Sequence, residues 1–183
     1  RSSLECVYKA VAPERGNEQE PVRMKEDRMI LQTGGAVSKF YSYYNFAKDS
    51  LLKADPNNAL KAVEHKNGTA ACLYTGYPEA GRLTLTDAVA STYYTYEEKV
   101  PQIKWTIGDQ TREILGYKCR RADCDLYGRH FTAWFTDEIP VASGPWKLQG
   151  LPGLIMAAAD DEGLYSFEII GLRSVERPVE FTD

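Results

Sequence analysis

Residues 144–155 read Gly-Pro-Trp-Lys-Leu-Gln-Gly-Leu-Pro-Gly-Leu-Ile, a stretch dense in glycine, proline and aliphatic residues. Pro152 and Gly153 suit the second and third positions of a type II turn, because proline presets φ and glycine takes a positive φ. Leu151 and Leu154 stand at the outer corners, where a solvent-exposed turn would carry polar residues. The pattern therefore predicts a tight reversal held against apolar neighbours, with extended chain on both sides.

Gly150, Leu151, Pro152, Gly153 and Leu154 are interpreted as a structural turn. The five residues contain no titratable group, hydroxyl or thiol, so they cannot transfer a proton or attack a substrate. Anion binding by the backbone amides of the turn is the alternative role.

The sequence Gly-Leu-Pro-Gly-Leu-Ile resembles the motif that names the GLPGLI family of bacterial envelope proteins. The resemblance continues through residues 116–119, 128–129, 133–136 and 138–140, and more loosely to residues 38–44. That family has no established activity, so the resemblance implies a fold and a compartment. The implied fold is a half-barrel similar to those of lipoprotein carriers. The implied compartment is the periplasm or the outer membrane, reached by export with removal of a signal peptide, which agrees with a chain that starts at Arg1.

Short β-rich segments separated by turn residues make up most of the chain. Their close spacing predicts an antiparallel sheet, and the helix–strand alternation of a parallel sheet is absent. The predicted strands are residues 4–11, 27–33, 37–44, 70–75, 82–86, 91–97, 103–107, 113–122, 129–136, 154–159 and 164–172.

Residues 45–66 differ from this pattern, because they contain helix-forming residues interrupted at Asp55-Pro56-Asn57. We expect short helices there, with leucines such as Leu51 and Leu52 packed on an apolar surface. The expected fold class is therefore mainly β (α+β), with a single curved antiparallel sheet that forms an open half-barrel. The helices of residues 45–66 would lie on its concave face, and residues 1–183 would form a single domain.

Composition argues against two properties, nucleic-acid binding and a membrane-spanning helix. The formal net charge is −4, which does not give the basic surface that nucleic-acid binding requires. No run of about 18 apolar residues is present, so no transmembrane helix is expected.

The four cysteines, Cys6, Cys72, Cys119 and Cys124, are even in number and are able to pair in an oxidising compartment. The short separation favours a Cys119–Cys124 disulfide at the end of a hairpin, with Cys6–Cys72 as the second bridge. Three pairings are possible, and four buried free thiols are the alternative. A thiolate metal site with His130 is less favoured still.

The sequence predicts no catalytic residue, no metal and no cofactor. His65 and His130 lie in no recognisable catalytic motif. Paired carboxylates can hydrolyse glycosides, but the acidic clusters here, at residues 97–98, 137–138 and 160–162, stand next to turns, where they are interpreted as solvated. Enzymatic activity is accordingly disfavoured.

Aromatic residues are abundant, with 12 tyrosines, 6 phenylalanines and 3 tryptophans. Tyr41, Tyr43, Trp134 and Trp146 are the candidate ligand-binding residues, although aromatic side chains also simply fill cores. The first hypothesis is a non-enzymatic envelope protein that binds an apolar or peptide-like ligand in the concavity. The alternative is an assembly partner of an outer-membrane protein complex, acting through an exposed sheet edge or the turn, and a hydrolase is least favoured.

Overall fold

The structure, a computed structural model, describes residues 3–14, 21–55, 57, 68–89, 92–176 and 179. These residues form one helix, α1 (Tyr43–Ala54), and eleven strands. The strands are β1 (Ser3–Pro13), β2 (Met24–Gly34), β3 (Val37–Ser42), β4 (Cys72–Thr75), β5 (Arg82–Val89), β6 (Thr92–Lys99), β7 (Thr106–Ile114), β8 (Tyr117–Leu126), β9 (Arg129–Thr136), β10 (Leu154–Asp160) and β11 (Ser166–Val175).

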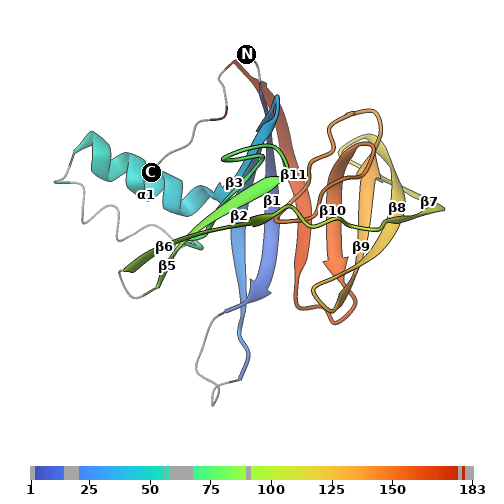
Figure 1. The fold of residues 1–183 in the computed structure, drawn as a ribbon, viewed down its shortest axis with the longest axis horizontal. Coiled ribbons are helices and arrows are strands. Elements are labelled where there is room, and N and C mark those ends of the chain that lie inside the picture. The colour runs from blue at the N-terminus through green and yellow to red at the C-terminus, as the bar shows by residue number, and fades with distance from the viewer. Residues whose placement is uncertain are drawn as a thin grey trace.

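All eleven strands belong to one antiparallel sheet in the order β6-β5-β4-β3-β2-β1-β11-β10-β9-β8-β7 (Figure 1). The first and last strands, β1 and β11, pair in the middle of the sheet. Consecutive strands β6 and β7 form its two opposite edges, so residues 100–105 run from one edge to the other. This connection requires strong curvature, and the sheet remains open because the two edges do not pair.

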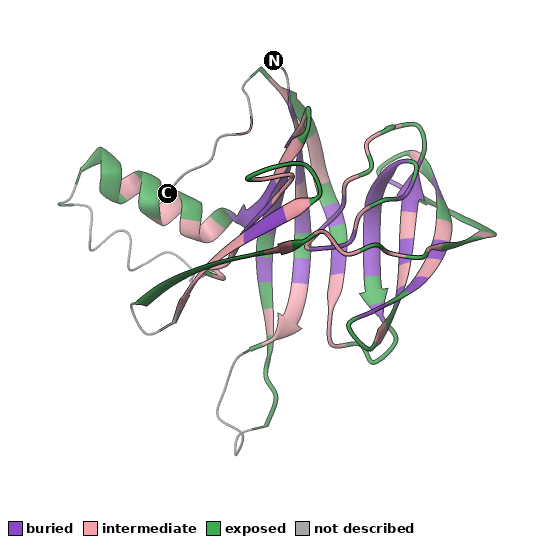
Figure 2. Ribbon diagram, viewed as in Figure 1, coloured by how far each residue is buried: buried purple, intermediate pink, exposed green. Residues whose placement is uncertain are grey.

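The core lies on the concave face. Cys6 and Tyr8 on β1 and Leu31 on β2 are almost fully buried there, and they alternate with side chains that point to the outer face. Figure 2 shows this alternation as buried and more exposed bands along the central strands. The rings of Phe40 on β3 and Phe167 on β11 meet at 6.1 Å, which brings distant parts of the sheet together.

The chain itself fills the concavity. Leu148 and Leu151, from the connection between β9 and β10, join the buried core. Trp105 donates its indole N–H to the carbonyl oxygen of Gln149 at 2.9 Å, and the Gln149 amide donates to the carbonyl oxygen of Pro101 at 3.0 Å. Two connections therefore cross the concave face and are bonded to each other.

The prediction of a mainly β fold with one open, curved antiparallel sheet is confirmed. A helix does interrupt the strands near residue 45, and β3 ends at Ser42, so the predicted strand over residues 37–44 gives way to α1 at Tyr43. The second predicted helical segment, residues 58–64, lies outside the described residues.

The expected position of the helix on the concave face is wrong. None of the residues of α1 is buried, and Phe46 lies beside Ile30 and Tyr41, which belong to the outer face. Figure 1 shows α1 beside β2 and β3, away from β8 to β10. The physical reason is that the connection between β9 and β10 already fills the concave side.

Gly153 is required for a different reason than the turn pattern suggests. Left-handed backbone occurs nearby at Trp146 (φ 54°) and Gly150 (φ 94°), but Gly153 is not among the positive-φ residues. A Cβ atom at Gly153 would stand 1.9 Å from the carbonyl oxygen of Thr136. The neighbours Leu151 and Leu154 are 1% and 0% exposed. Pro152 is exposed.

The predicted disulfides are wrong, since all four cysteines are free in the structure. Cys119 and Cys124 lie on the same strand, β8, rather than on the two sides of a hairpin end. A separation of five residues in a strand places side chains on opposite faces about 17 Å apart, far beyond the span of a disulfide. Cys6 on β1 and Cys72 on β4 are separated by two intervening strands.

Candidate binding pocket

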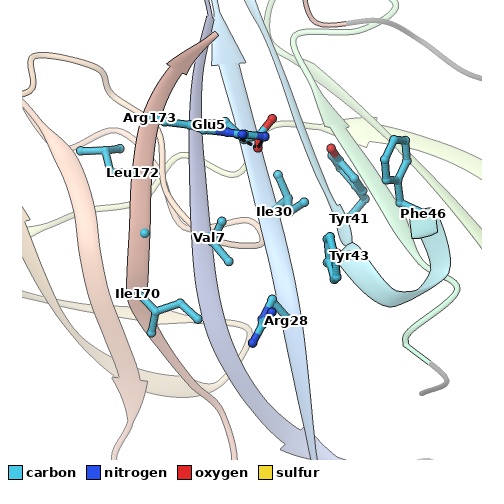
Figure 3. Close-up of a pocket in the computed structure, with 11 residues that line it drawn as sticks. Glu5, Val7, Arg28, Ile30, Tyr41, Tyr43, Phe46, Ile170, Leu172 and Arg173 are labelled. Atoms are coloured by element: carbon cyan, nitrogen blue, oxygen red, sulfur yellow. Dashed lines mark hydrogen bonds and ion pairs between the residues drawn. The ribbon is translucent and has the colours of Figure 1, made fainter. Parts of the chain in front are cut away.

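A hollow lies on the outer face of the sheet, opposite the core. It has a volume of about 550 Å³, which falls in the range of small-molecule sites. Five elements contribute to it, namely β1, β2, β3, α1 and β11 (Figure 3). The alternation of strand side chains creates it, because Val7 points outward between the buried Cys6 and Tyr8.

Aromatic side chains form one wall of this outer-face pocket. The rings of Tyr41 and Phe46 meet edge to face at 5.6 Å, and Tyr43 lies below them in Figure 3. Tyr41 is buried, whereas Tyr43 and Phe46 are 40% and 45% exposed. The Ile170 side chain stands on the β11 side, whereas Leu172 lies opposite Cys6 in the strand register and packs against the core (Figure 3). Aromatic and aliphatic side chains therefore form part of the lining.

Three charged side chains line the same pocket. The Glu5 side chain is only 4% exposed, and its Oε1 atom accepts hydrogen bonds from Arg173 Nε at 2.9 Å and Nη2 at 2.6 Å. A carboxylate is buried at an acceptable free energy only when it is paired in this way. Arg28 lies over the Tyr43 ring at 5.8 Å, and no described carboxylate pairs with its guanidinium group. Two guanidinium groups and one carboxylate leave the pocket with one positive charge.

The structure separates the four aromatic residues that the sequence singled out. Tyr41 and Tyr43 lie together in the outer-face pocket. Trp134 lies under the guanidinium group of Arg112, at 5.0 Å, in a smaller hollow of about 370 Å³ over β9, β10 and β11. Trp146 contacts Tyr127 at 5.9 Å on the opposite side of the sheet. The four residues therefore do not form one site.

Sequence reasoning missed Glu5, Arg28, Phe46 and Arg173. Glu5 carried a signal, because it is a charged residue inside an apolar strand, between Leu4 and Cys6. Arg28 and Arg173 gave none, since their proximity to Glu5 depends on β1 pairing with both β2 and β11. Phe46 gave none, because the contacts of α1 with β2 and β3 bring it to the pocket.

The histidine and carboxylate groups outside the pocket form local ion pairs. His130 Nδ1 lies 2.9 Å from Asp125, a contact that raises the pKa of the histidine above 6.5. A hydrogen bond from Arg121 lowers the pKa of Asp123 below 3.8. Asp160 accepts from the Tyr165 amide at 2.7 Å and from Arg129 at 3.0 Å, which stabilises a hairpin turn.

Other acidic side chains singled out in the sequence also have partners within the chain, and Glu138 accepts a hydrogen bond from the Lys118 backbone amide at 3.2 Å. Glu97 pairs with Arg82 at 3.2 Å, and Glu98 pairs with Lys147. His65 lies outside the described residues. Within the described part of the chain, no group of three or more histidine, cysteine or acidic side chains is arranged to hold a metal ion.

The thiols of Cys6, Cys119 and Cys124 are poor nucleophiles. Burial raises the pKa of Cys6 to about 12 and the pKa values of Cys119 and Cys124 to about 11. Since the thiolate is the nucleophile, these groups are unreactive at neutral pH in the folded protein.

Part of the chain resembles a protein family. Residues 127–157 match the family described as "Protein of unknown function (Porph_ging)". The match starts in the turn between β8 and β9, includes the Leu151–Leu154 stretch and ends in β10. No curated protein sequence is significantly similar to this chain.

The fold is similar to that of a solved protein. Two structures, titled "Structure of PNGF-II in C2 space group" and "Structure of PNGF-II in P21 space group", each superpose with a TM-score of 0.66 at 12% sequence identity. Each similarity covers 98% of this chain and 29% of the other, so the chain spans less than a third of that protein. At this identity the similarity shows the fold alone. Among the described helices, none is long and apolar enough to cross a membrane.

Proposed function

We propose that this chain is a non-enzymatic binding module that holds an apolar or peptide-like ligand in the outer-face pocket. The observation that carries the proposal is the pocket of about 550 Å³ itself, whose lining combines aromatic and aliphatic side chains with two guanidinium groups and one carboxylate. The concavity, where the ligand was expected from sequence, is filled by Leu148, Leu151 and their neighbours.

The charges of the pocket favour a ligand with a single negative charge. Glu5 and Arg173 satisfy each other, which leaves the Arg28 guanidinium group to bind a carboxylate. Tyr41, Phe46 and Ile170 would contact the apolar body of the same molecule. A fatty acid and the C-terminal end of an apolar peptide both have this chemistry.

We propose in addition that the chain is a GLPGLI-type protein exported to the periplasm or the outer membrane. The support is the motif at Gly150 to Ile155 and the match of the surrounding residues 127–157 to a family of unknown function. Fractionation of the source cells, with the protein followed by an antibody, tests this placement, and recovery only from the cytoplasm would contradict it.

Binding is tested by titrating purified protein with a medium-chain fatty acid and, separately, with a short apolar peptide that has a free C-terminal carboxylate. We expect saturable binding of at least one probe by calorimetry. Arg28→Gln should weaken binding about tenfold, the loss of roughly 1.4 kcal/mol expected for a charge-assisted hydrogen bond.

Gly171→Leu provides an independent block. A Cβ atom at Gly171 meets Val7 at an ordinary 3.7 Å, so the substitution adds a side chain within the pocket lining without a backbone clash. We expect it to abolish binding while the protein still folds. Trp134→Phe, which changes the smaller hollow, is the matched control and should bind like the parent. Equal binding by all three variants, or none by the parent, would contradict the proposal.

An assembly role is the second candidate, and one observation favours it. The edge strand β6 presents three exposed tyrosines, at 84%, 54% and 47% exposure for Tyr93, Tyr94 and Tyr96. Such a surface is unusual for a strand at the edge of the sheet that the described residues form.

A further inference from the structure

Edge strand β6 is unprotected over its first five residues. Residues 92–96 read Thr-Tyr-Tyr-Thr-Tyr, and all five are exposed (Figure 2). Natural edge strands usually carry lysine, proline or a bulge that discourages pairing with another chain. None of these devices occurs between Thr92 and Tyr96, and β6 pairs with β5 without a register shift.

The opposite edge of the same sheet is protected. Strand β7 has a register shift between Ile107 and Thr111 against β8, and it carries charged side chains at Asp109, Arg112 and Glu113. The β6 edge therefore permits the addition of another strand, whereas the β7 edge hinders it.

The exposed part of β6 also extends beyond the neighbouring strands. β4 pairs with β5 only from Leu83 to Thr86, whereas β6 pairs with β5 as far as Val89. The end of the hairpin that holds Thr92 to Tyr94 is therefore two-stranded where the structure describes it. Two-stranded ribbons are marginal in water and are stabilised by a third strand.

We propose that β6 pairs antiparallel with β6 of a second copy of this chain, which joins two sheets edge to edge. The partner is inferred to be a second copy because the sequence of residues 92–96 is complementary to itself in an antiparallel pair. With Tyr94 opposite Tyr94 of the partner subunit, the remaining pairs join Thr92 to a tyrosine and Tyr93 to a threonine. Aromatic and β-branched residues are favourable cross-strand neighbours.

The distribution of charged residues along β6 is compatible with this pairing register. The five central residues are uncharged, so no like charges meet across the two-fold axis. The acidic residues that follow are already paired within the chain, Glu97 with Arg82 and Glu98 with Lys147. The paired strands alone bury less than the area of a standard interface of roughly 1,600 Å², so the dimer should be weak and dependent on concentration.

Sedimentation velocity of the purified protein over a wide concentration range tests the proposal. We expect reversible dimers that increase with concentration. Tyr94→Lys places two lysines opposite each other and should weaken dimerisation about tenfold or more, and Tyr94→Glu should do the same. A mixture of the two variants should recover association, because a lysine then faces a glutamate.

Thr111→Lys is the control on the protected edge β7, and it should dimerise like the parent. Circular dichroism and thermal unfolding check that each variant is folded. A parent protein that is monomeric at all concentrations would overturn the proposal. So would a Tyr94→Lys variant that dimerises normally, or a mixture of the two charged variants that fails to associate.

Discussion

The hydroxyl group of Tyr8 donates a hydrogen bond of 2.6 Å to the carbonyl oxygen of Ile155. Tyr8 is fully buried on β1, near the start of the chain, and Ile155 is the last residue of the Gly-Leu-Pro-Gly-Leu-Ile stretch. The bond therefore joins the N-terminal strand to the motif across 147 residues of sequence. Since Ile155 lies in β10, the bond also links two strands that are separated in the sheet by β11.

Tyr8→Phe should reduce the free energy of unfolding by about 1–3 kcal/mol, because a buried carbonyl oxygen loses its donor. Chemical denaturation measures the change. Tyr117→Phe removes a hydroxyl for which no hydrogen bond exists among the described residues, and it should change stability by less than about 0.5 kcal/mol. Equal effects of the two substitutions would show that the Tyr8 bond contributes nothing specific.

Gly153→Ala should destabilise the protein by about 3 kcal/mol, since the added Cβ would stand 1.9 Å from the Thr136 carbonyl oxygen. Gly116→Ala is the comparison, because Gly116 has a φ of 79° but open space around its Cβ position. Backbone strain alone should cost about 1–2 kcal/mol there. Thermal and chemical unfolding of both variants distinguish a lack of space from a need for positive φ. If Gly116→Ala is the more damaging change, the packing explanation of Gly153 is wrong.

Leu154→Ala should lower the free energy of unfolding by about 2–5 kcal/mol, because the leucine side chain is fully buried. Pro152→Ala, at the exposed position of the same stretch, should cost less than about 1 kcal/mol. Ligand binding by the outer-face pocket should persist in both variants under conditions where they are folded. Loss of binding with unchanged melting would instead make the stretch a recognition element.

The pKa of His130 should exceed its ordinary value of 6.5, chiefly because Asp125 accepts a hydrogen bond from the ring. A raised folded-state pKa means that the stabilising contribution is complete below pH 6.5 and is lost as pH rises through the folded pKa. An NMR titration measures it, with the ring signal assigned by comparison with His130→Gln. Asp125→Asn should move the midpoint back toward 6.5, and an unchanged midpoint would exclude Asp125 as the cause.

All four cysteines should be titratable as free thiols. A thiol reagent at neutral pH should react slowly with the folded protein, because burial keeps Cys6, Cys119 and Cys124 protonated. In denaturant under non-reducing conditions, four thiols should react at once. Detection of only two would demonstrate a disulfide and would contradict the free cysteines of the structure.

Local pattern was enough to predict the class of the fold. Residues such as Arg129–Thr136 alternate between two faces and are bounded by turn residues, so their β structure follows from side-chain periodicity and turn chemistry alone. The buried corners Leu151 and Leu154 were foreseeable in the same way, because apolar residues at a turn need apolar neighbours.

Long-range pairing decided what local pattern could not. Whether Cys119 and Cys124 lie across a hairpin or along one strand depends on where β8 turns, and the turn comes at Tyr127-Gly128, after both cysteines. The outer-face pocket exists because β1 pairs with both β2 and β11, which brings Glu5, Arg28 and Arg173 together from opposite ends of the chain. The helix was excluded from the concave face because the β9–β10 connection occupies it. These outcomes depend on competition between segments for the same apolar surface, and no single segment carries that information.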